Sequence, residues 1–454
     1  MYAKNAWEKY DKTTLKEVMK FADDYKDFLT YGKTERRVVT ESIELAKKAG
    51  FVDAKELKTV KFGDKVYFTN KGKNIALFVI GKESLTNGLN ILGAHIDSPR
   101  LDLKQNPLYE AKGYALLDTH YYGGVKKYQW VTIPLALYGV VCKKDGTTID
   151  IAIGDDPKDP VVGISDLLIH LSADQMGKNA AHVIEGEDLD VTCGSIPLKD
   201  KGVKANILKI LKSKYDFEEE DFLSAEIEVV PAGPTRDYGL DRSMVAGYGH
   251  DDRCCAYTSL RAILEMEPSD RTGCCILVDK EEIGSVGATG AQSQFFDNCI
   301  AELISKMEDY NDLKLRYAFT NSYMLSSDVS AGFDPLFPGV MDSRSGNTAY
   351  LGNGICFNKY TGSRGKSGSN DCMPEYFAKV RECMDANNVN YQTCELGKVD
   401  QGGGGTIAYI LGNKNMNVVD AGLPVLNMHA PQEIVSKADL YEAYSCYKAF
   451  LLIK

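Results

Sequence analysis

The strongest constraint on the fold is an alternation of strand-like and helix-like segments, which starts near residue 246 and continues to the C-terminus. The expected strands are 273–278 and 415–419, and the expected helices are 291–307, 374–384 and 438–452. A crossover between parallel strands normally runs through a helix. The pattern therefore predicts an α/β fold with a mostly parallel sheet.

The middle of the chain has a different character. Residues 106–239 are rich in Tyr, Val and Ile, and a hairpin is predicted there around Gly146. Because strands before and after this segment are expected to share one sheet, the segment is predicted to be a second, β-rich domain inserted into the first. The predicted domains are 1–105 with 240–454, and 106–239.

Composition narrows the class of protein. The net charge of −11 argues against nucleic acid as a partner, because phosphate binding needs a basic face. No apolar run is long enough to span a bilayer, so no membrane association is expected. The first residues lack the apolar core of a signal peptide. The 12 cysteines, which include two adjacent pairs, are expected to be reduced in a cytoplasmic protein.

Two motifs place polar residues where α/β folds bind ligands. His95, in residues 93–99, follows an apolar strand, and Asp97 is suited to hold the second ring nitrogen of a metal-bound His95. A lone histidine is more often an ordinary surface or core residue. The Asp251-Asp252 pair starts a predicted helix, where aspartate commonly serves as a cap. One such carboxylate is also able to bridge two metal ions about 3.5 Å apart.

Three further motifs complete a possible metal site. Glu281 and Glu282 follow a strand, and their repulsion is relieved if one binds metal and the other activates water; the alternative is a solvated acidic turn. Asp328 and His429 also follow apolar segments. Each motif is weak alone, but together they offer the imidazole and carboxylate ligands of two divalent ions. Zinc, cobalt and manganese all accept this set.

The sequence resembles the aspartyl aminopeptidase and vacuolar aminopeptidase I family, which is metallopeptidase family 18. The resemblance is carried by residues 93–99, 281–285 and 403–407, in the same order as in the family. It implies a zinc-exopeptidase fold, in which a mixed-sheet catalytic domain carries an inserted β-rich dimerisation domain.

The resemblance also implies roles for particular residues. His95 and Asp328 would hold one zinc ion, Glu282 and His429 the other, and Asp251 would bridge them. Glu281 would be the general base, and Asp97 would orient His95. The resemblance further implies that His170 reaches a neighbouring subunit's active site in a dimer-based dodecamer. Lys359 and Gly404 are expected to contact substrate.

The expected function is hydrolysis of the N-terminal peptide bond of peptides, with acidic N-terminal residues preferred. Three segments depart from the family pattern, at 129–134, 330–334 and 358–363, so parts of the substrate pocket are expected to differ from those of the family. One alternative is a dipeptidase or N-acyl amino acid hydrolase of the same clan. The other is a non-catalytic scaffold, which an intact Glu281 argues against.

Overall fold

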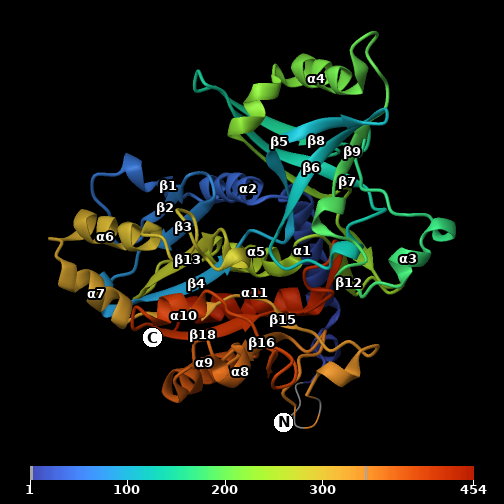
Figure 1. Cartoon of the computed structure of the whole chain (residues 1–454). Coiled ribbons are helices and arrows are strands. Elements are labelled where there is room, and N and C mark those ends of the chain that lie inside the picture. Colours follow the sequence, from blue (N-terminus) through green and yellow to red (C-terminus); the bar gives the residue numbers. More distant parts are fainter. Residues whose placement is uncertain (1–3, 343, 345) are drawn as a thin grey trace. The chain divides into compact units, whose positions relative to one another are not determined.

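The computed structural model describes residues 4–342, 344 and 346–454 (Figure 1). The chain divides into two compact units. The first comprises residues up to Asp97, Thr235–Met428 and Glu433–Lys454, and the second comprises Ser98–Pro234 and His429–Gln432. The sequence predicts these limits at 105/106 and 239/240, and it gives no sign that the short piece His429–Gln432 groups with the inserted segment.

A nine-stranded mixed sheet is the main sheet of the first unit, within the described residues. In spatial order its strands are β1 (Val52–Asp53), β2 (Lys65–Asn70), β3 (Asn74–Val79), β13 (Thr272–Val278), β4 (Leu89–His95), β14 (Tyr323–Ser326), β18 (Asn417–Gly422), β16 (Ile355–Asn358) and β17 (Tyr391–Thr393). The central four, β13, β4, β14 and β18, are parallel, and antiparallel pairings occur toward both edges. This agrees with the predicted α/β class.

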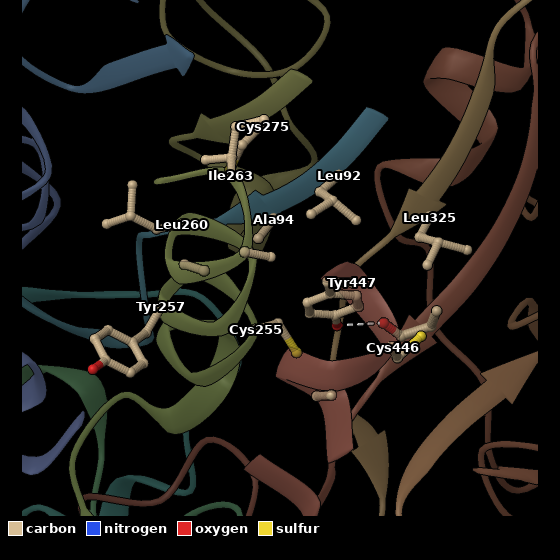
Figure 2. Packing of buried hydrophobic residues seen from close by; sticks show 14 of the residues in the cluster. Leu92, Ala94, Cys255, Tyr257, Leu260, Ile263, Cys275, Leu325, Cys446 and Tyr447 are labelled. Atoms are coloured by element: carbon tan, nitrogen blue, oxygen red, sulfur yellow. Dashed lines mark hydrogen bonds between the residues drawn. The ribbon is translucent and has the colours of Figure 1, made fainter. Parts of the chain in front are cut away.

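Helices cover both faces of this sheet, because successive side chains of a strand point to opposite faces. In β3, Leu77 packs in the core on one face and Phe78 in the core on the other. The first core contains α1 (Lys12–Tyr31), α2 (Glu35–Lys48), α5 (His250–Leu264), α9 (Pro374–Ala386) and α11 (Lys437–Leu451). The second contains α6 (Phe295–Met307), α7 (Asp312–Thr320) and α10 (Ala408–Gly412). Figure 2 shows Tyr447 of α11 beside Leu92 and Leu325 of the central strands, and Leu260 of α5 belongs to the same core. One further short helix is α8 (Ser363–Lys366).

A smaller five-stranded sheet also belongs to the first unit, as far as the described residues show. Its strands, in order, are β11 (Arg236–Tyr238), β12 (Met244–Gly247), β20 (Glu433–Ser436), β19 (Pro424–Leu426) and β15 (Ser330–Ala331). It connects the segment before α5 with the segment before α11, because β12 pairs with β20.

The second unit contains a six-stranded antiparallel sheet in its described residues. In order its strands are β8 (Thr148–Ile153), β7 (Leu135–Cys142), β10 (Ala225–Pro231), β5 (Arg100–Ala111), β6 (Tyr114–Tyr122) and β9 (Val191–Gly194). The unit also holds a short helix α3 (Ala173–Met176) and the 14-residue helix α4 (Gly202–Tyr215), which packs on β5, β6 and β9 (Figure 1). The sequence pattern does not predict α4. Within the described residues, no helix is long and apolar enough to cross a membrane.

Asp439 in α11 holds a loop by two buried hydrogen bonds. Its carboxylate oxygens accept the backbone N–H groups of Gly352 and Gly354, both at 2.7 Å. Asp439→Ala would leave both amides buried without an acceptor, so we expect the free energy of unfolding to fall by about 2–4 kcal/mol. Chemical denaturation would measure this loss. An unfolding midpoint equal to that of the wild type would contradict it.

Candidate metal centre

Three of the predicted motifs of the first unit lie at one edge of the main sheet. His95 is the last residue of β4, and it pairs with Val278, the last residue of β13. Glu281 and Glu282 form a tight turn directly after β13, and Asp328 follows β14, the other neighbour of β4. Parallel strands present their carboxyl ends at the same edge. Sheet order alone therefore brings three separate parts of the sequence together.

His95, Asp251 and Asp328 form a compact group of possible metal ligands, with one ligand atom of each lying within 4.8 Å of the others. The Nε2 atom of His95 is 3.2 Å from Oδ1 of Asp251 and 3.9 Å from Oδ1 of Asp328. Zinc bonds of 2.0–2.2 Å in a tetrahedron place ligand atoms roughly 3.4 Å apart. The two distances from His95 are close to this spacing.

Asp97 connects His95 to the glutamate turn. The Nδ1 atom of His95 lies 3.1 Å from the Asp97 backbone carbonyl and 3.4 Å from its carboxylate. The same carboxylate accepts the backbone N–H groups of Glu281 and Glu282, at 3.1 and 3.2 Å. Acceptors on the Nδ1 side keep Nε2 of His95 directed at Asp251 and Asp328.

The electrostatics of the group favour a bound cation. Burial, together with the negative charges of Glu281, Asp251 and Asp420, raises the pKa of Asp328 well above its usual range, and His95 only partly offsets this. Burial lowers the pKa of His95, but its hydrogen bonds to Asp251 and Asp97 raise it well above the usual value. Carboxylates crowded in this way need either protons or a cation. A divalent ion therefore fits the donors that are present.

Glu282 and His429 are the other two predicted ligands. Glu282 is half-buried in the turn after β13. His429 belongs to the other compact unit, where its Nδ1 donates to the backbone carbonyl of Gly124 at 2.9 Å. Its role as a ligand stays a prediction.

His170 is exposed in the second unit, in a turn between Leu168 and Ser172. Its neighbours are apolar and also exposed, with Ile169 and Leu171 each 70% accessible. It is therefore not a histidine of the core of its own domain.

Lys359 directly follows β16, and Gly404 lies in the loop between β17 and α10. Lys359 lines a cavity of 570 Å³, and Gly402 and Gly403 line another of 230 Å³. The backbone N–H of Gly404 donates to Thr361 at 2.9 Å. Gly403 has a φ of +119°, and a Cβ there would lie 2.7 Å from the backbone of Ser363, so the loop requires glycine. Neither cavity is lined by the clustered ligands.

Two carboxylates near the cluster were not predicted as site residues. Asp252 is buried and accepts the backbone N–H of His95 at 3.3 Å. Glu433 accepts a hydrogen bond from the backbone N–H of Asp251 at 3.0 Å. For Asp252, the sequence offers one weak signal, which is its position next to Asp251. Glu433 has no local signal, because its partner lies 182 positions earlier in the sequence.

Comparison with known proteins gives consistent matches along the whole chain. The family described as "Aminopeptidase I zinc metalloprotease (M18)" matches residues 28–451. A "Probable M18 family aminopeptidase 1" of Clostridium acetobutylicum is 60% identical, over 99% of this chain and 98% of that protein. The solved M18 aminopeptidase of Thermotoga maritima is 43% identical with a TM-score of 0.96, covering 100% of both chains. Aminopeptidase I of C. acetobutylicum is 59% identical with a TM-score of 0.91, covering 99% of this chain and 98% of that chain.

Proposed function

Because the chain belongs to the M18 family of zinc aminopeptidases, we propose that it removes N-terminal residues from peptides at a site built for two metal ions. Membership makes it a metallopeptidase. The spacing of the ligand atoms of His95, Asp251 and Asp328 is the observation that carries the proposal. Their donor set, one imidazole and two carboxylates, suits zinc.

The proposed assignment of ligands gives each ion two ligands of its own. His95 and Asp328 would hold one ion. Glu282 and His429 would hold the other, and Asp251 would contact both. The ions, when bound, polarise the substrate carbonyl and make water a stronger acid.

Glu281 is the proposed general base. Its carboxylate lies beside the cluster, with Oε2 at 3.9 Å from Nε2 of His95, and its backbone is held by Asp97. From this position Glu281 takes a proton from the attacking water and delivers it to the leaving amine. The free α-amino group of the substrate, being positive, is attracted to the surrounding carboxylates.

A preference for acidic N-terminal residues is part of the proposal. Its support is that cationic side chains outnumber carboxylates around the two cavities: Lys359, Arg364, Lys366, Arg381 and Lys398 line them, together with Glu395 and Asp400. Kinetics on a panel of aminoacyl chromophores, dipeptides and N-acyl amino acids would test this. We expect cleavage of aminoacyl substrates, fastest for Asp and Glu. Cleavage restricted to dipeptides or N-acyl amino acids would contradict the proposed aminopeptidase activity.

The proposal includes a cytoplasmic location and a homo-oligomer. The 12 cysteines are all thiols, nine of them buried, which suits a reducing compartment. The exposed apolar residues around His170 have the character of an interface, because such patches are rarely left in contact with water. A dimer-based dodecamer in which His170 reaches a neighbour's site is the assembly proposed.

His170→Phe should lower turnover by about 10²-fold if His170 stabilises the oxyanion of a neighbouring site. Phe keeps the turn apolar, so bound metal and particle size should not change. Mixing this variant with Glu281→Gln under conditions of subunit exchange should restore part of the activity. Unchanged turnover in His170→Phe, or a fully active monomer by light scattering, would contradict the shared site.

A further inference from the structure

Glu433 is a buried carboxylate at the first position of β20, 1% exposed. It lies opposite Gly247 in the pairing of β12 with β20. From there its Oε2 accepts the backbone N–H of Asp251 at 3.0 Å. Strand β20 therefore contacts the proposed bridging ligand through a side chain far from it in sequence.

The N–H of Asp251 lies ahead of the regular part of α5, because Asp251 (φ −79°, ψ 108°) and Asp252 have non-helical backbone angles, so the helix provides no acceptor for it. Such groups are usually capped by a nearby Ser, Thr, Asp or Asn. Gly249, which precedes this segment, has no side chain that could accept the N–H. Burying the Glu433 carboxylate is costly, so an acceptor next to Asp251 in the sequence would be the simpler solution.

Two other carboxylates near the cluster hold backbone groups in the same way. Asp252 accepts the N–H of His95, and Asp97 accepts those of Glu281 and Glu282. Each fixes the main chain of a residue whose side chain faces the proposed ions. In Asp251 the carboxylate is only two bonds from the Cα, so anchoring its N–H limits where Oδ1 lies relative to His95.

We propose that Glu433 is a positioning residue for Asp251, acting through the hydrogen bond that it accepts rather than through its charge. This inference rests on the proposed function, because it takes Asp251 to be a metal ligand. It predicts that length and acceptor geometry at position 433 determine metal affinity.

Two conservative variants separate geometry from charge. Glu433→Gln keeps the length and an acceptor oxygen but removes the charge, whereas Glu433→Asp keeps the charge and withdraws the oxygen. Zinc affinity of the metal-stripped full chain would be measured by competition with a chromogenic chelator. Loss of an outer partner of a metal ligand typically lowers affinity by about 10–100-fold. We expect at least a ~10-fold loss for Glu433→Asp and Glu433→Ala, and a change of under about threefold for Glu433→Gln.

Asp439→Ala is the matched control, because Asp439 is also a buried carboxylate that accepts backbone N–H groups. It should lower the unfolding midpoint and leave zinc affinity unchanged. Wild-type affinity in Glu433→Asp, or a Gln variant as weak as the Asp variant, would overturn the inference. If the wild-type chain itself bound no zinc, the proposed function would fail instead, and the two failures would be distinguishable.

Discussion

Glu281→Gln is expected to reduce turnover by a factor of about 100 or more while both metal ions stay bound. Gln has nearly the same shape as Glu and keeps the backbone N–H that Asp97 accepts. It cannot take a proton from water at neutral pH. The loss should therefore appear in kcat, with little change in KM, because the substrate contacts remain.

The neighbouring residue supplies the control for this experiment. Glu282 has the same side chain in the same turn, but it is a proposed ligand. Glu282→Gln should lower the metal content of the purified enzyme, whereas Glu281→Gln should not. Near-normal turnover in Glu281→Gln would show that another group is the base. Loss of metal from that variant would show that Glu281 is a ligand.

Asp251→Ala is expected to remove both activity and metal, since one carboxylate is proposed to serve two ions. In the structure, Oδ1 of Asp251 is 3.2 Å from Nε2 of His95, and both side chains are buried. Without Asp251, each ion loses a ligand and the two ions lose their connection. Turnover should fall below detection, and elemental analysis should find fewer than two ions per chain.

Asp252→Asn is the comparison for this variant. Asn keeps an oxygen for the backbone N–H of His95, which Asp252 accepts. It should therefore keep two ions and part of the activity. If Asp251→Ala still binds two ions per chain, another carboxylate must be the bridging ligand.

Several parts of this architecture follow from local sequence patterns. Strands β13 and β4 are apolar runs that are buried along their whole length, and polar residues follow them directly. The chemistry at their ends is therefore visible in the sequence. The order of the strands in the sheet cannot be seen in the sequence, because β4 pairs with β14, which lies more than 200 residues later.

Other parts depend on contacts that local patterns do not record. Helix α4 has mixed polarity and a single residue, Val203, in its buried set, so its apolar periodicity is weak. Helix α6 begins at Phe295 rather than at the predicted residue 291, and residues 291–294 form turns and bends instead. Glu433 stands in an ordinary strand, and only the pairing of β12 with β20 brings it to Asp251.

The most direct test of the two-metal site is a zinc titration of the metal-stripped enzyme, with release of the N-terminal residue measured at each addition. We expect negligible activity without metal and full activity only when two ions are bound per chain. Full activity at one ion per chain, or activity that persists after complete metal removal, would contradict it.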